Sequence, residues 1–244
     1  MNPTWQTFLT GRETNPDGIR RASADIAASA AAMTIIADLS HESLIAVDGT
    51  DSRAFLQGQL STDIDALTPD ASQLSSWSSA KGRVVVVLRL LQYDDTLLLM
   101  LPRSLQATVM KRLSMYVLRS RVKLSDASEA LVHFGLAGDN AARLLATADL
   151  PAPEKTNTVV KHDGMHIVRL HGSMPRFLIA GSAETLMPVW EALSAAGAIA
   201  VNEERWAWHK IQAQEPTVYP ETSEHFVAQM IGLEELGAID FKKG

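Results

Sequence analysis

The sequence predicts an α+β protein built from two consecutive lobes, each an antiparallel sheet with helices packed against it. A strand–helix–strand–strand–helix order occurs twice along the chain. Gly49-Thr50-Asp51, after one strand, is mirrored by Gly138-Asp139-Asn140 at an offset of 89 residues. The 244 residues are 46% hydrophobic, which is ample for buried cores. We therefore expect an N-terminal arm and first lobe over residues 1–128, and a second lobe over residues 129–244.

The first lobe follows a polar arm that ends in an alanine-rich helix, Ile26–Met33. Its elements are expected to be a strand Leu44–Val47, a helix capped by Asp51 or Ser52, strands Leu74–Ser79, Val84–Leu91 and Thr96–Leu101, a helix from Ser104, and a strand with Val122 and Leu124. An apolar stripe formed by Leu56, Leu60, Ile64 and Leu67 predicts that the first helix runs through all four. Gly58 would then lie in the middle of this helix, where it suggests the close approach of a strand or ligand, or a tight packing contact.

The second lobe repeats this order with weaker signals. Its elements are expected to be a strand Leu131–Leu136, a helix with Leu144 and Leu145, strands His166–Leu170 and Phe177–Ala180, and helices Thr185–Leu193 and Glu203–Gln212. His162 and His166 are four apart, but Asp163-Gly164 between them favours a turn over a helical metal pair.

The composition excludes several classes of function. No cysteine is present, so these residues supply no disulfide, thiolate nucleophile or cysteine-ligated metal, and we predict no metal site. The motifs of dinucleotide-binding, P-loop, zincin and nucleophile-elbow proteins are absent. The N-terminus does not resemble a secretory signal, and no apolar run is long enough to span a membrane. We expect a cytoplasmic monomer that binds neither membranes nor DNA directly.

The charge is distributed unevenly. The segment from Lys81 to Lys123 holds nine basic and two acidic residues and is therefore +7, whereas the whole chain is −6. Such a segment suits a small anionic ligand or a polyanion backbone, although a solvated helix face gives the same pattern. Lys81, Arg83 and Arg89 precede or lie within an otherwise apolar strand, so they must face solvent, an ion partner or a ligand.

Several segments resemble the YgfZ family, the folate-binding relatives of the glycine-cleavage T-protein (aminomethyltransferase). The resemblance is carried by GTDSRAFLQGQLSTD (49–63), AKGRVVVVLRL (80–90), LRSRVK (118–123), PRFLI (175–179) and the closing Lys243-Gly244. It implies the aminomethyltransferase (GcvT-like) folate-binding fold, with a signature cysteine and a C-terminal β-barrel expected beyond Gly244.

The resemblance also implies a ligand and its contacts. The ligand would be tetrahydrofolate or a derivative, in a protein that supports iron–sulfur cluster assembly or repair and thereby tRNA modification, with iron–sulfur proteins or tRNA-modifying enzymes as partners. Trp206 matches a tryptophan that lines the family's folate pocket. The other implied site residues are the cations Lys81, Arg89, Arg119 and Arg176, the channel residues Gln57, Gln59 and Gln229, and Lys243 and Gly244 of the signature.

One departure from the family pattern concerns catalysis. Aminomethyltransferases carry an aspartate in the stretch that corresponds here to Gly82–Val87, which is valine-rich and has no carboxylate. Valine cannot transfer a proton, so we predict no catalytic residue and no aminomethyl transfer. Two alternatives stay open: a true folate-dependent aminomethyltransferase, and an adaptor that docks an iron–sulfur or tRNA-modifying enzyme through basic residues such as Lys111 and Arg112.

Overall fold

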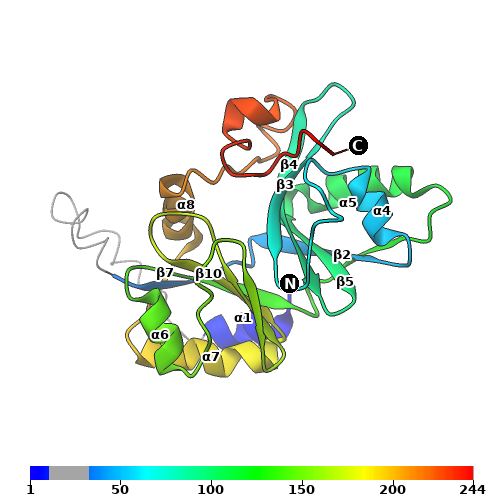
Figure 1. The fold of residues 1–244 in the computed structure, drawn as a ribbon. Helices are drawn as coiled ribbons and strands as arrows, with labels where there is room; N and C mark the ends of the chain where they lie inside the picture. Colours follow the sequence, from blue (N-terminus) through cyan, green and yellow to red (C-terminus); the bar gives the residue numbers. More distant parts are fainter. Residues whose placement is uncertain (11–32, 244) are drawn as a thin grey trace. The chain divides into compact units, whose positions relative to one another are not determined.

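The computed structural model describes residues 1–10 and 33–243, which fall into two compact units (Figure 1). Unit 1 contains residues 1–40 and 128–214, and unit 2 contains residues 41–127 and 215–244. Each unit combines two segments that are separated along the chain, because the first strand pairs with strands of the second half and the C-terminal segment bonds to the first half.

Unit 1 is built on a six-stranded sheet in the order β11-β1-β7-β10-β9-β8. Its neighbours are antiparallel except for β1 and β11, which run parallel. The strands are β1 (Ile35–Asp38), β7 (Val132–Ala137), β8 (Val159–His162), β9 (Met165–Arg169), β10 (Arg176–Gly181) and β11 (Ile199–Val201).

Three helices bury their apolar sides against one face of this sheet. They are α1 (Pro3–Thr10), α6 (Ala141–Thr147) and α7 (Ala183–Ala195). Trp5 of α1 is fully buried, lies edge-on to Trp190 of α7, and donates from Nε1 to Asp38 Oδ1 at 2.8 Å. A buried tryptophan with a satisfied N–H anchors a short helix well, although an eight-residue helix is marginal by itself.

Unit 2 contains a five-stranded antiparallel sheet in the order β3-β4-β5-β2-β6. The strands are β2 (Glu42–Asp48), β3 (Ser72–Ser78), β4 (Val84–Tyr93), β5 (Thr96–Pro102) and β6 (Lys123–Asp126). Helices α4 (Ser52–Gln57) and α5 (Arg103–Val117) contribute Phe55, Leu56, Leu105, Val109 and Leu113 to one core with these strands.

The two units share a topology, which confirms the predicted α+β pseudo-repeat. Each has the order strand, helix, three strands, helix, strand, and β3-β4-β5-β2 in one sheet corresponds to β8-β9-β10-β7 in the other. Gly49 and Gly138 occupy equivalent positions after β2 and β7, with φ of +112° and +136°. A Cβ at Gly49 would lie 2.0 Å from Arg121 O, and one at Gly138 would lie 2.7 Å from Met33 O, so both turns require glycine.

The first predicted helix is shorter than its apolar stripe indicated. Helix α4 ends at Gln57, and Gly58 is its C-cap rather than an interior residue. Leu60 forms an isolated bridge to Trp77, while Ile64 and Leu67 are buried from non-helical backbone. The stripe thus predicted burial correctly and helix incorrectly, because a compact loop can bury the same side chains.

Other elements were not predicted, among them α1, β1, β8 and β11. The predicted helix Ile26–Met33 falls outside the described residues except for Met33. Helix α8 (Glu203–Gln212) has the predicted bounds, and the turn at Asp163-Gly164 joins β8 to β9 as a hairpin. Among the described residues, no helix combines the length and apolar character needed to cross a membrane.

Candidate functional site

Trp206 of α8 lies against the sheet of unit 1. Its side chain is 2% exposed, and a Cβ added to Gly135 of β7 would come within 2.4 Å of the indole ring. The strand can approach the ring this closely only because residue 135 has no side chain. Arg176 of β10, 1% exposed, places its guanidinium carbon 5.7 Å from the centre of the same ring. The structure therefore brings together two of the predicted folate contacts, Trp206 and Arg176.

Other basic residues of unit 1 interact with Arg176. Arg176 donates from Nε to His171 O at 3.1 Å, and Arg169 donates from Nη1 to Arg176 O at 3.2 Å. His209, one helical turn after Trp206, is buried, and its pKa is lowered to about 4 by burial, by Arg205 and by Arg176. Burial, followed by Arg176, also lowers the pKa of Arg169. This part of unit 1 is thus positively charged.

In unit 2, the predicted channel residues Gln57 and Gln59 hold the segment after α4. Gln57 donates from Nε2 to Asp63 Oδ1 at 3.0 Å and accepts from Ile64 N at 2.7 Å. Gln59 Oε1 accepts from Trp77 Nε1 at 3.3 Å. Both glutamine side chains therefore make hydrogen bonds within unit 2 that hold the loop after α4 in place.

The C-terminal segment docks on that same loop, so residues of the 49–63 segment contact the segment that ends in Lys243. Ser61 Oγ donates to Ala238 O at 2.6 Å, and Asp240 N donates to Ser61 O at 2.9 Å. Lys243 Nζ donates to Leu60 O and, at 3.0 Å, to Thr62 O. Burial lowers the pKa of Lys243, opposed by Asp63, Asp240 and Asp65. Gly244, its partner in the signature, lies outside the described residues.

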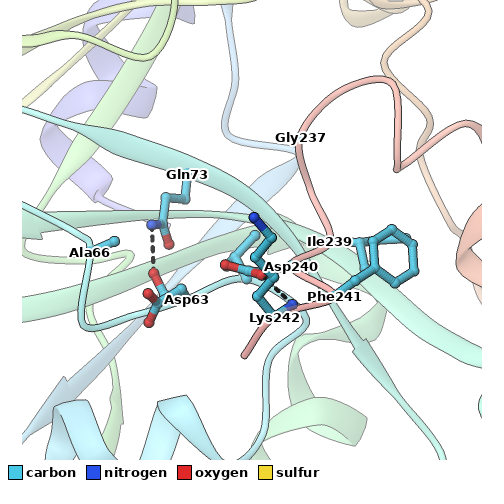
Figure 2. Close-up of a pocket in the computed structure, with 9 residues that line it drawn as sticks. Asp63, Ala66, Gln73, Gly237, Ile239, Asp240, Phe241 and Lys242 are labelled. Carbon is cyan, nitrogen blue, oxygen red and sulfur yellow. Dashed lines mark hydrogen bonds between the residues drawn. The ribbon is translucent and has the colours of Figure 1, made fainter. Parts of the chain in front are cut away.

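A cavity of about 360 Å³ lies beside this junction (Figure 2). Asp63 and Gln73 stand on one side of it, Asp240 and Lys242 stand across from them, and the ring of Phe241 points away. Gln73 donates from Nε2 to Asp63 O at 2.8 Å, and Lys242 N donates to Asp240 Oδ1 at 2.7 Å. The cavity therefore offers carboxylates, an amide and an ammonium group within one small volume.

The other predicted cations of unit 2 differ in their surroundings. Lys81 and Arg119 are exposed. Arg89 is 5% exposed, donates from Nη1 to Ser72 Oγ at 3.0 Å and lies 3.9 Å from Glu215, so its side chain is engaged within the unit. Gln229 is exposed on the short helix η1 (Ala228–Ile231).

The stretch that would hold an aminomethyltransferase aspartate is buried apolar strand. Val84, Val85, Val86 and Val87 are all buried in β4. Among the described residues there is also no group of three or more histidine, aspartate or glutamate side chains that could hold a metal ion.

Sequence reasoning missed Ser61 and His209 as parts of these sites. Ser61 bonds to backbone 177 residues away, and such a partner leaves no side-chain pattern in the sequence. His209 was interpreted as an isolated histidine. Its i, i+3 spacing from Trp206 was the available signal, because that spacing puts both side chains on one helix face.

The chain belongs to the family defined by the GCVT N-terminal domain, which matches residues 15–161. Its fold resembles that of the glycine cleavage system aminomethyltransferase T from Bartonella henselae, with a TM-score of 0.62 and 22% identity over 70% of this chain and 48% of that one.

Among curated proteins, the chain is similar to tRNA-modifying proteins YgfZ. It is 30% identical to that of Klebsiella pneumoniae (strain 342) over 201 residues, which are 82% of this chain and 61% of the relative. It is 31% identical to that of Photorhabdus laumondii over 204 residues, which are 82% of this chain and 60% of the relative. The chain thus spans about three fifths of the length of these relatives.

Proposed function

We propose that this chain binds tetrahydrofolate or a derivative as part of a YgfZ-type protein that serves tRNA modification. The observation that carries the proposal is its membership of the GCVT N-terminal domain family together with an aminomethyltransferase-like fold. The finer part of the proposal is that folate binding supports assembly or repair of iron–sulfur clusters used by tRNA-modifying enzymes.

The residues present fit a folate in part. A pterin is a flat ring and a folate tail carries carboxylates, which suit an indole face and arginine or lysine side chains respectively. In unit 1, Trp206 would supply the indole and Arg176 beside it a guanidinium, and the exposed cations Lys81 and Arg119 belong to unit 2. The Trp206 ring is only 2% exposed and packs against Gly135, so the fit of a ligand to this ring is partial.

Binding without aminomethyl transfer is the proposed mode of action. The valines of β4 offer no proton donor or acceptor in the stretch where the transferases carry their aspartate. We also propose that Lys243 fixes the signature segment on the loop after α4 through its bonds to two backbone carbonyls.

Isothermal titration calorimetry with tetrahydrofolate, under reducing conditions, tests the proposal. We expect saturable binding that is weakened about three- to tenfold by Lys81→Ala or Arg119→Ala, because each removes one exposed cation. Lys161→Ala is the matched control, since Lys161 is an exposed lysine of β8 without a proposed ligand contact. Absence of saturable binding would contradict the proposal, and equal affinity in all three variants would contradict the contacts proposed for Lys81 and Arg119.

The proposed role in iron–sulfur cluster assembly or repair needs a separate measurement. The iron–sulfur cluster occupancy of a cluster-dependent tRNA-modifying enzyme is compared after purification from cells that contain or lack this protein. We expect lower cluster occupancy in the enzyme from cells lacking it. Equal occupancy would remove the iron–sulfur role and leave folate binding standing.

A further inference from the structure

The turn between α5 and β6 carries an apolar side chain that the fold does not bury. Leu118, directly after α5, is 87% exposed. Its φ of +47° lies in the left-handed region, which costs conformational energy for most residues other than glycine. Burial of the leucine side chain does not offset that cost. A strained and exposed leucine therefore points to a role outside the packing of the fold.

The same turn is held in one shape by hydrogen bonds. Ser120 N donates to Val117 O at 2.8 Å, and Val122 N donates to Ser120 O at 2.9 Å. Asp51, the residue before α4, accepts from Arg121 N at 2.7 Å, and its other carboxylate oxygen lies 3.5 Å from Arg121 Nη2. Because a rigid surface loses little conformational freedom when a partner binds, this turn is preorganised for an interaction.

Exposed apolar side chains continue from the turn onto the last helical turn of α5. Met115 is exposed and Tyr116 is half-exposed. The Tyr116 ring lies edge-on to Trp77 with ring centres 6.3 Å apart, so packing fixes the ring while part of it faces solvent. Large apolar side chains that gather on a surface mark interaction sites. An open hollow of about 740 Å³ lies beside them, lined by Asp51, Leu118, Arg119 and Ser120.

Cationic side chains surround the apolar ones. Lys111 lies one helical turn before Met115, so these two side chains are neighbours on the surface of α5. Arg119 lies in the turn, and Lys123 begins β6, the strand at one edge of the unit 2 sheet. Lys111, Arg119 and Lys123 are exposed, and none of the three forms an ion pair within the described residues. With the exposed Arg121 they make this surface positive, although the chain as a whole is −6.

We propose that this α5–β6 surface, made of Lys111 and the exposed side chains of residues 115–123, binds a single-stranded loop of tRNA. Such a loop presents an anionic backbone and unstacked bases. Lysine and arginine side chains bind the backbone phosphates, and aromatic side chains such as Tyr116 stack on the bases. This inference rests on the proposed function, in which the protein serves tRNA modification, and it names the RNA itself as a partner.

The composition of the surface favours single-stranded RNA over other partners. Lysine is depleted in protein–protein interfaces but binds phosphates readily, and two of the exposed cations, Lys111 and Lys123, are lysines. An RNA duplex would leave Tyr116 without a base to stack on, because its bases are already stacked. A second copy of the chain, related by a two-fold axis, would set this positive surface against itself.

Fluorescence anisotropy with a labelled tRNA transcript, over a range of salt concentrations, tests the proposal. We expect saturable binding with a Kd of about 1–100 µM near physiological salt, the range of largely electrostatic contacts. The triple variant Lys111→Gln, Arg121→Gln and Lys123→Gln should bind at least about tenfold more weakly. It should also reduce the slope of log K against log salt concentration by about 2–3, because three phosphate contacts are lost. Arg119 is left unchanged because it is a proposed folate contact.

Substitutions of Tyr116 separate base stacking from charge. Tyr116→Ala should weaken binding at least about fivefold and leave the salt slope unchanged, since stacking on a neutral ring releases no counterions. Tyr116→Phe keeps the ring and should bind as the parent does. The matched charge control is Arg143→Gln, Lys155→Gln and Lys161→Gln, at three exposed residues of unit 1, and it should keep the parental slope.

The outcomes separate this surface from the proposed folate function. Absence of saturable tRNA binding overturns the inference, even where calorimetry shows that tetrahydrofolate binds, and an acidic protein then becomes the alternative partner. Equal weakening by the two triple variants also overturns it, because the charge of the whole chain would then be responsible. Parental affinity in Tyr116→Ala overturns the base contact. Binding of tRNA, with the expected losses, by a chain that does not bind tetrahydrofolate supports the surface and removes the folate function.

Discussion

Replacing Gly135 by alanine should displace Trp206 and destabilise unit 1. The added Cβ would lie 2.4, 2.5 and 2.7 Å from three carbons of the indole ring. Carbon atoms pack at about 3.5–4.0 Å, so the ring or strand β7 must move by about 1 Å. The ring is 2% exposed and its neighbours include the buried Arg176, so there is little room for that movement. Overpacking of this kind costs about 1–3 kcal/mol.

Guanidinium chloride unfolding followed by tryptophan fluorescence measures this cost, and a tetrahydrofolate titration measures its effect on binding. We expect a lower transition midpoint and weaker binding, because a displaced indole presents a different surface. Gly58→Ala is the control for the same chemical change, since its Cβ would lie 3.5 Å from the nearest atom and its φ is −78°. A Gly135→Ala protein with stability within about 0.5 kcal/mol of the parent would refute the packing argument.

Three further predictions concern charge. In Lys243→Met, hydrogen exchange at the amide of Asp240 should be roughly 5- to 30-fold faster, because losing the bonds to two carbonyls costs about 1–2 kcal/mol. Lys242→Met is the control, and equal exchange rates in the two variants would disprove the docking role of Lys243. Glu224→Gln should cost up to about 1 kcal/mol near pH 7, since it removes a 2.6 Å ion pair with an α5 arginine. The hydrogen bond from Arg112 lowers the Glu224 pKa, so the ion pair stabilises the fold above pH 4.5 and this stabilisation is lost as acid protonates Glu224 in the folded state. The difference in stability between the parent and Glu224→Gln, measured by denaturant unfolding, should therefore disappear at low pH. His209 titrates near pH 4 in the folded chain and near 6.5 when unfolded, so stability should fall by roughly 2–3 kcal/mol as the pH drops through this window, and His209→Gln should flatten that dependence in urea titrations.

Local patterns in the sequence predicted the elements that depend on local interactions. Helix α8 was predicted with its observed bounds, and the repeated glycine turns after β2 and β7 gave the pseudo-repeat. The stripe from Leu56 to Leu67 misled because hydrophobic spacing reports burial, and residues 58–67 achieve that burial without a helix. Strand β1 was missed because its partners lie about 100 or more residues further along the chain.

The candidate sites were predictable in part, for the same physical reason. Residue type and family resemblance marked Trp206 and Arg176, and the structure brings them together. The docking of Lys243 could not be read from side-chain patterns, because its partners are backbone carbonyls that every residue carries. The unpartnered nitrogen of His209 depends on the absence of a neighbour, which only the folded chain reveals.

Because the chain passes from unit 1 to unit 2 and back, the two sheets become complete at different times during synthesis on the ribosome. All strands of the unit 2 sheet lie within residues 41–127, so this sheet can pair before most of unit 1 has been made. The unit 1 sheet has to wait for β11, and its first strand, β1, is made long before either of its neighbours. Domains generally form as they emerge from the ribosome, and exposed strand edges promote aggregation. Among the described strands, the short, apolar β1 therefore waits longest for its partners, and it is the strand that a holding chaperone would protect.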